Sequence, residues 1–101
     1  MSVNIVAESS SHLDYYDMHD AVYEGELPFD FIPMPNLGVD GGDALGICIP
    51  TKNAIESTWL KLLPVLEVLR TKFDCDVYEL YGGEQLTDFN RENFRSNLFL
   101  K

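Results

Sequence analysis

The chain has 101 residues, of which 46% are hydrophobic and 24% are charged, and its formal net charge is −10. This length fits a single domain with one core, and the hydrophobic fraction argues against a disordered chain. A negative charge of this size repels phosphates, which argues against direct binding to nucleic acids and to anionic membranes.

The negative charge is concentrated in the first half of the chain. Residues 1–51 contain nine acidic residues and no lysine or arginine, whereas residues 52–101 contain eight acidic and seven basic residues. Because opposite charges attract over long distances, the first half is expected to favour basic protein surfaces.

Two elements are expected before residue 28. Residues 3–7 alternate apolar and polar side chains in most positions, which predicts a short strand. Ser11 and Asp14 match a capping box, which predicts a helix start. Four side chains then share one face at helical spacing, with Asp14, Asp17 and Asp20 on the other side: Tyr15, Met18, His19 and Val22. A strand over the same residues is an open alternative.

Residues 28–50 are expected to be extended and interrupted by turns. A short strand is predicted over residues 29–32 and is closed by Pro33 and Pro35, which cannot donate to a sheet ladder. Residues 38–43 predict a flexible acidic loop. The apolar run at residues 44–49 predicts a buried central strand, which Pro50 ends.

The clearest element is a long helix over about residues 53–73. Asn53 is the predicted N-cap, and Glu56 completes a capping box. An apolar stripe follows at helical spacing: Ile55, Trp59, Leu62, Leu63, Leu66, Leu69 and Phe73. Pro64 lies inside this helix and is expected to kink or divide it.

The last part of the chain predicts a hairpin and a short helix. A strand is expected at residues 76–81, a turn at Gly82-Gly83 and a returning strand at residues 84–87. A helix over residues 88–97 would carry Arg91 and Arg95 as ion-pair donors, and the apolar residues 98–100 are expected to dock onto the body or a partner. These elements together predict a single α+β domain, in which the long kinked helix packs on one face of a small, mostly antiparallel sheet.

The familiar chemical motifs are missing from the sequence. Two histidines and three aspartates lie within residues 12–20, but no i, i+4 histidine pair is present for metal chelation. The glycines between residues 38 and 46 match neither a phosphate-binding loop nor an EF-hand. Cys75 lies between Asp74 and Asp76, whose charges disfavour a thiolate. We therefore expect no catalytic residue, no metal and no cofactor.

The number of cysteines and the composition of residues 1–20 predict the cellular compartment. Cys48 and Cys75 are too few for a disulfide framework and are expected to be reduced, with a bridge between them as the alternative. Residues 1–20 lack the basic start and apolar run of a signal peptide, so the cytoplasm is expected.

These features predict a non-catalytic module that binds a basic protein such as a nuclease, a toxin or a nucleic-acid-binding protein. Acidic inhibitors, immunity proteins and mimics of nucleic acids use the same physics, in which opposite charge steers association. Tyrosines would supply contact area, although most aromatic rings are expected in the core. The predicted partner-binding residues are Asp14, Tyr15, Tyr16, Asp17, Asp20, Tyr23, Glu24, Glu26, Asp40 and Asp43.

Two other functions fit the same sequence. One is a small enzyme or small-ligand-binding domain, with its site near residues 40–43 and the start of the Asn53 helix. The other is a homodimeric structural subunit that associates through a free sheet face or through the apolar tail. A concave polar pocket would favour the first alternative, and self-association in solution would favour the second.

Overall fold

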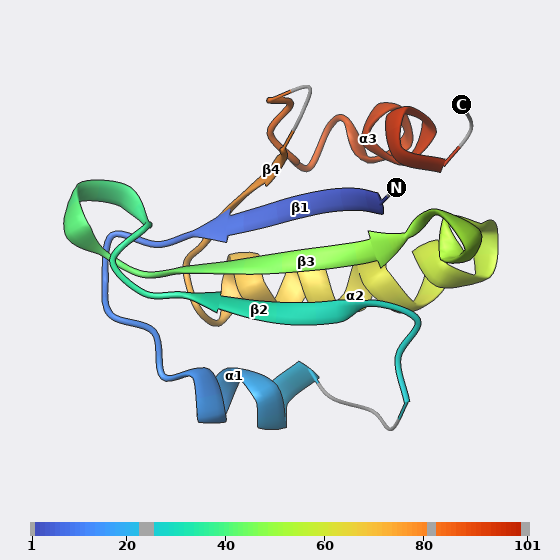
Figure 1. Ribbon diagram of the computed structural model, residues 1–101. Helices are drawn as coiled ribbons and strands as arrows, with labels where there is room; N and C mark the ends of the chain where they lie inside the picture. Colours follow the sequence, from blue (N-terminus) through green and yellow to red (C-terminus); the bar gives the residue numbers. More distant parts are fainter. Residues whose placement is uncertain (1, 23–25, 81–82, 100–101) are drawn as a thin grey trace.

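The computed structural model describes residues 2–22, 26–80 and 83–99, without the side chains of 97–99. It shows an antiparallel sheet with helices on one face and beyond two edges (Figure 1). The helix α2 (Glu56–Thr71) crosses one face of the sheet. Two shorter helices, α1 (Tyr15–Val22) and α3 (Arg91–Phe99), lie beyond the two opposite edges. The predicted class, an α+β domain with a long helix on an antiparallel sheet, is confirmed.

The sheet has the strand order β2-β3-β1-β4, and every pairing is antiparallel. Its strands are β1 (Ser2–Glu8), β2 (Asp30–Met34), β3 (Ala44–Pro50) and β4 (Asp76–Glu79). The strands β1 and β3 pair along their whole length, with Ile5 opposite Ile47. The strands predicted over residues 3–7 and 44–49 are therefore confirmed.

The strand β2 continues through Pro33 to Met34, so Pro33 does not close it as the sequence predicts. Among the described strands, β2 is at the edge of the sheet and pairs with β3 alone. An edge strand tolerates proline because the missing N–H can face away from the partner strand. The sequence could not show which strand would lie at the edge.

The core lies between α2 and the inner face of the sheet. Side chains alternate along a strand, so one set from each strand points toward α2. Apolar residues of α2 at intervals of three and four point back toward the sheet. The buried apolar residues that form the core between these two layers are Ile5, Ala7, Leu45, Ile47, Ile49 and Val77 of the sheet and Trp59, Leu62, Val65, Leu66 and Leu69 of α2.

The helix α2 begins at Glu56, so the predicted N-cap at Asn53 is wrong. Asn53 belongs to the 3-10 turn η2 (Thr51–Asn53), and its side-chain amide donates a hydrogen bond to the carbonyl of Pro28. Ile55 occupies the N-cap position without a side-chain hydrogen bond. A tertiary contact therefore replaces the local cap that the sequence suggested.

The helix α2 is continuous across Pro64, which excludes the division that was one of two expected outcomes. Pro64 has no N–H to donate to the carbonyl of Leu60. Both residues are exposed, so water can solvate that carbonyl.

The hairpin predicted after residue 76 is formed only in part. The strand β4 ends at Glu79, and the chain returns beside it with an isolated bridge between Tyr78 and Gln85. The N–H of Glu79 donates to the carbonyl of Glu84. The predicted turn includes Gly82, which lies outside the described residues.

The helix α3 begins at Arg91, which confirms the predicted last helix. Before it, the side-chain carbonyl of Asn90 accepts the N–H of Thr87, and the backbone carbonyl of Asn90 accepts the N–H of Phe94. Phe94 is fully buried, and its ring lies 6.5 Å from the ring of Trp59 in α2. The docking predicted for residues 98–100 concerns side chains outside the described part.

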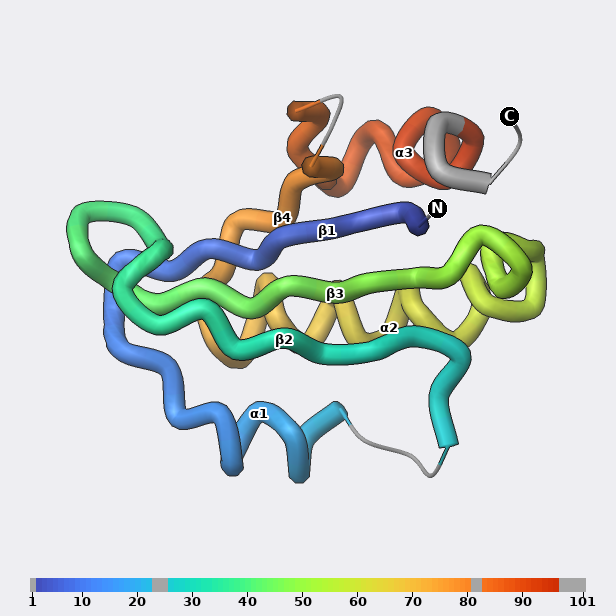
Figure 2. The backbone as a smooth tube through the Cα atoms, in the orientation of Figure 1, coloured from blue at the N-terminus to red at the C-terminus, as the bar shows by residue number. Residues whose placement is uncertain are grey.

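The outer face of the sheet is not covered by any helix of the described chain (Figure 2). Strand alternation places Val6, Ile32 and Cys48 on this face, and Ile32 is half exposed. Cys48 is half-buried here, whereas Cys75 is buried before β4, and both are free cysteines.

Candidate functional site

The first turn of α1 is capped by Asp14. Its carboxylate accepts the backbone N–H groups of Tyr16 and Asp17. Asp14 is therefore the N-cap, in place of the predicted Ser11, because its side chain reaches the free N–H groups of the first turn.

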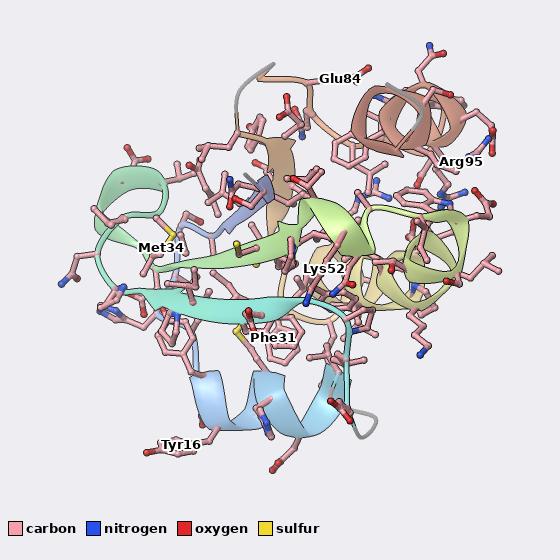
Figure 3. The ribbon with its side chains drawn as sticks, turned by 45° about the vertical axis from the view of Figure 1, so that its right-hand side comes forward. Tyr16, Phe31, Met34, Lys52, Glu84 and Arg95 are labelled. Atoms are coloured by element: carbon pink, nitrogen blue, oxygen red, sulfur yellow. The ribbon has the colours of Figure 1, made fainter. Side chains whose placement is uncertain are left out.

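The helix α1 turns one side to the core and the other outward, as predicted. Met18 and Val22 are buried, whereas Tyr16, Asp17 and Asp20 are exposed. Tyr16 is 87% exposed and points away from the body of the protein (Figure 3). We call the outward side the acidic α1 surface; it consists of Asp14, Tyr16, Asp17 and Asp20.

Tyr15 does not belong to this surface, although the sequence placed it among the partner-binding residues. It is half-buried, and its hydroxyl donates a hydrogen bond of 2.7 Å to the carbonyl of Ala44. Burial, and then the nearby charge of Asp43, raise the pKa of the Tyr15 hydroxyl. Tyr15 therefore attaches α1 to the sheet.

Asp43 also has a structural position. It is 6% exposed, and its two carboxylate oxygens accept the backbone N–H groups of Leu13 and Asn36 at 2.8 and 2.9 Å. These N–H groups, of which that of Asn36 has the larger effect, hold the pKa of Asp43 below its usual range. His12 Nδ1 lies 3.5 Å from the same carboxylate. Because both oxygens are engaged inside the protein, we remove Asp43 from the partner-binding set.

The loop over residues 38–43, for which the sequence predicts a flexible acidic loop, contains a hydrogen-bonded turn. It contains the 3-10 turn η1 (Val39–Gly41), and the N–H of Val39 donates to the carbonyl of Ser9. A Cβ on Gly38 would overlap the carbonyl oxygens of Ser9 and Asp43, so the close approach of the two segments requires glycine.

The other predicted partner-binding residues are dispersed. Tyr23 and Glu24 lie outside the described residues. Glu26 is exposed and lines a groove between α1 and α2 that also contains Lys61. Asp40 is exposed in η1, which projects at one end of the sheet and away from α1 (Figure 2). Of the predicted partner-binding residues that the structure describes, it groups the four of the acidic α1 surface.

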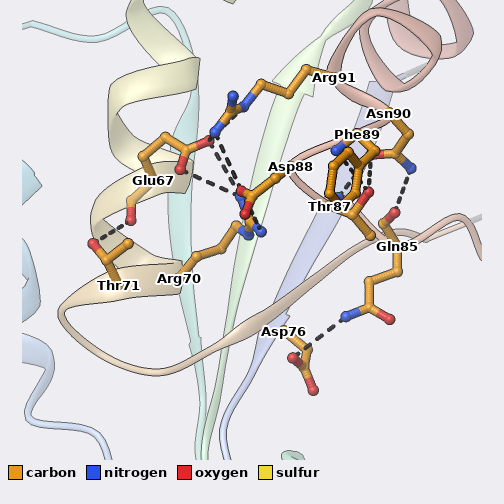
Figure 4. A network of polar contacts seen from close by, with 10 residues as sticks. All are labelled: Glu67, Arg70, Thr71, Asp76, Gln85, Thr87, Asp88, Phe89, Asn90 and Arg91. Atoms are coloured by element: carbon orange, nitrogen blue, oxygen red, sulfur yellow. Dashed lines mark hydrogen bonds and ion pairs between the residues drawn. The ribbon is translucent and has the colours of Figure 1, made fainter.

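All three arginines of the chain are paired outside this surface. Arg70 and Arg91 both contact Glu67 of α2 and Asp88, which joins four charges in one network (Figure 4). Arg95 pairs with Glu56 and Glu92. The predicted role of Arg91 and Arg95 as ion-pair donors is confirmed.

The acidic α1 surface has no such compensation. Within the described ranges, no lysine or arginine forms an ion pair with Asp14, Asp17 or Asp20. Asp20 is instead close to a histidine, since His19 Nδ1 lies 3.8 Å from Oδ1 of Asp20. The negative field of this helix therefore extends into solvent, where it attracts cations.

A pocket of about 150 Å³ lies between α1 and the sheet, and the sequence did not reveal it. We call it the α1–β2 pocket; its walls are formed by Tyr15, Met18, Val22, Phe31, Pro33 and Leu45, with His19 beside them. Helical spacing and strand alternation indicate which side chains point inward. Only the relative placement of α1 and β2 leaves a space between them.

The small-ligand site expected near residues 40–43 and the Asn53 helix does not form as one site. The first segment precedes β3 and the second follows it, so they lie at opposite ends of that strand (Figure 1). A seven-residue strand is about 20 Å long. These two segments therefore cannot converge on one small ligand.

The remaining chemical candidates are accounted for by burial and spacing. Burial, followed by the charges of Asp74 and Asp76, raises the pKa of Cys75 to about 11, as the sequence suggested in direction. Among the residues that the structure describes, no three or more His, Cys, Asp and Glu residues are grouped so that they could hold a metal ion. In the same ranges, no helix has the length and apolar character needed to cross a membrane.

No family model matches the chain, and neither a curated protein nor a solved structure matches it. Function must therefore be inferred from the residues. The acidic α1 surface and the adjoining α1–β2 pocket are the two features from which a function is inferred, because Tyr16, Asp17 and Asp20 are exposed and the pocket is open to an apolar group.

Proposed function

We propose that this protein is a non-catalytic binding module whose acidic α1 surface docks onto a basic surface of another protein. The observation that supports it is the exposure of Asp17, Asp20 and Tyr16 side by side, without a described lysine or arginine paired to the two aspartates. The arginines that would neutralise such a surface are instead paired with acids of α2 and α3.

The two residue types of this surface have complementary effects on binding. Exposed carboxylates speed the encounter with a basic partner, and that effect weakens as salt screens the charges. An exposed tyrosine adds rigid apolar contact area with a polar tip, which is why tyrosine is enriched in interfaces. Together they fit an inhibitor or immunity-type protein that covers a nuclease, a toxin or another nucleic-acid-binding protein.

The absence of catalysis is part of the proposal. Two groups with shifted pKa values, Asp43 and Cys75, are buried for structural reasons and point to no substrate. The two free cysteines are compatible with the reducing cytoplasm, where we place the interaction.

The test compares two triple variants in a pull-down from a lysate of the source organism. The first combines Tyr16→Ser, Asp17→Asn and Asp20→Asn on the acidic α1 surface. The matched control combines Phe89→Ser, Asp74→Asn and Asp76→Asn, which remove the same number of rings and charges from exposed positions elsewhere. Asp14 is left unchanged because it caps α1.

Retained proteins are identified by mass spectrometry after washes at about 0.1 M and 1 M salt, between which the Debye length falls from about 10 Å to about 3 Å. The proposal expects one basic protein on the wild type and the control, weakened at high salt and lost from the α1 variant. The purified pair must then reproduce this ranking in a direct titration. Equal binding by all three chains, or binding without salt dependence, would refute it.

Self-association through the outer sheet face is the competing explanation, because Ile32 is half exposed there. Light scattering at two concentrations, about tenfold apart, distinguishes the two. The docking proposal expects the mass of one chain at both concentrations, whereas a homodimer doubles that mass at the higher one.

A further inference from the structure

The α1–β2 pocket adjoins the acidic α1 surface and differs from it in chemistry. Met18 and Val22 line it from the helix, and Phe31 and Leu45 from the sheet. Figure 3 shows Phe31 between β2 and α1. The hydroxyl of Tyr15 is committed to the carbonyl of Ala44, so the walls present mainly carbon.

The size of the pocket limits what it can hold. Its volume is about 150 Å³. An apolar protein cavity of about 150 Å³ accepts a benzene-sized group. The pocket therefore matches one phenylalanine or leucine side chain.

One residue that lines the pocket is close to an exposed acid, since Nδ1 of His19 lies 3.8 Å from Oδ1 of Asp20. His19 is the lining residue next to the outward side of α1. Tyr16 is a neighbour of both His19 and Asp20, since residues three and four apart adjoin on a helix. On the strand side, Asp30 shares the outer face of the sheet with Cys48 and does not line the pocket. A chain that places a side chain in the pocket would thus bring its flanking residues close to the carboxylate of Asp20.

We propose that the α1–β2 pocket binds one phenylalanine- or leucine-sized side chain of the partner, from a segment in which lysine or arginine flanks that residue. This inference rests on the proposed docking function and adds an anchor to it. The apolar side chain supplies affinity by leaving water, and the flanking cations supply charge complementarity to Asp20 and its neighbours.

Charge selects this occupant over a second copy of the chain. Each chain has a net charge of −10, most of it in the first half, so two copies would repel each other at this surface. A basic segment gains attraction at the same place.

Four synthetic peptides test the inference on the full-length protein. They are capped pentapeptides with phenylalanine or alanine at the centre and with four lysines or four glutamines as flanks. Binding is followed by the NMR signal of the Met18 methyl group, which is 2% exposed and lies in the pocket wall. We expect the Lys-flanked Phe peptide to shift this signal most. Replacing its Phe with Ala should weaken binding about tenfold or more, because alanine removes much less apolar surface from water than a buried ring does.

A pocket-filling variant and a matched control test whether the preference for Phe over Ala arises in the pocket. Pro33→Phe places a ring at the pocket wall and should abolish the preference for Phe over Ala while leaving the salt-dependent attraction. Pro35→Phe makes the same change at an exposed position outside the pocket and should leave the preference intact. If Pro33→Phe fails to fold, the peptide series on the wild type decides alone.

The failures of the two proposals are distinguishable. Equal binding of the Lys-flanked Phe and Ala peptides, or an unmoved Met18 signal, would overturn the pocket while leaving charge-driven docking in place. Equal binding of the Lys-flanked and Gln-flanked Phe peptides would instead overturn the basic partner, because the pocket would then be a site for any small apolar group.

Discussion

Two regions of this protein are rich in acidic residues and use them in opposite ways. On α2 and in the segment that leads into α3, Glu67 and Asp88 are matched by Arg70 and Arg91, and each arginine contacts both acids. On α1, Asp17 has no described basic partner, and its charge is left to the solvent. The net charge of a chain therefore says less about its function than which of its acidic residues are paired with basic residues.

The same two regions show that α1 and α3 are held to the protein mainly by apolar contacts and not by their charged residues. The helix α3 is held to α2 by buried Phe94 as well as by ion pairs, and partly exposed ion pairs contribute little to stability. The helix α1 is attached by Met18, Val22 and the Tyr15 hydrogen bond, none of which involves its aspartates. Four substitutions, from the largest expected effect to the smallest, test this division.

Phe94→Ala should have the largest effect. It removes a fully buried ring beside Trp59 and should lower the free energy of unfolding by about 3–5 kcal/mol. Urea unfolding of this variant and of Phe89→Ala gives the comparison, because Phe89 is 97% exposed. The control should change stability by less than about 0.5 kcal/mol. A small loss in Phe94→Ala would mean that the ion pairs hold α3.

Asp43→Asn tests whether every acid of the first half is free for binding, because Asp43 belongs to that half and stabilises the fold. Its carboxylate accepts two backbone N–H groups, one of which would face an amide N–H₂ in the variant. The melting temperature at neutral pH should fall by roughly 5–10 °C. Asp40→Asn, in the same loop at a positive φ that asparagine tolerates, should leave it nearly unchanged.

The pH dependence of Asp43 follows from the direction of its shift. Its folded pKa lies below the unfolded value, so its stabilising effect is complete above about pH 3.9 and is lost as the pH falls through the folded pKa. Thermal melts between about pH 5 and pH 2 should show a steeper loss for the wild type than for Asp43→Asn. Parallel curves would mean that Asp43 does not govern acid stability.

Glu67→Gln should have a modest effect. Glu67 is 30% exposed and is shared by two arginines, so its loss should cost about 0.5–1 kcal/mol. Glu92→Gln is the control, since Glu92 is 80% exposed and contacts Arg95 alone among the described arginines. The difference between the two should shrink in about 1 M salt, where surface charges are screened. A cost above 2 kcal/mol would give the network a larger role in holding α3 than assigned above.

Asp20→Asn should change stability least, and with the opposite sign. Asp20 is in the last turn of α1, where a negative charge opposes the helix dipole, so the variant should gain up to about 0.5 kcal/mol. Asp17→Asn, in the first turn, should lose a similar amount. Thermal melts at low salt provide the measurement. Clear destabilisation by Asp20→Asn would show that this aspartate is structural, which weakens its assignment to partner binding.

Local signals predicted the elements but not their ends. The alternation in residues 3–7 and the stripe from Trp59 to Leu69 were sufficient for β1 and α2. The ends of α1 and α2 differ from prediction because Asp14 caps α1 instead of Ser11, and the Asn53 amide turns to Pro28. Cap residues have several possible partners, and distant segments decide among them.

The sequence by itself determined the α+β class, the long helix, the central strand and a first half without lysine or arginine. These features depend on periodicity and composition, which are local properties. Only the tertiary structure decided that Asp43 and Tyr15 turn inward while Tyr16, Asp17 and Asp20 remain exposed. It alone also decided that α1 and β2 leave a pocket between them. The physical reason is that burial and charge pairing depend on which segments meet, and those segments are far apart in the chain.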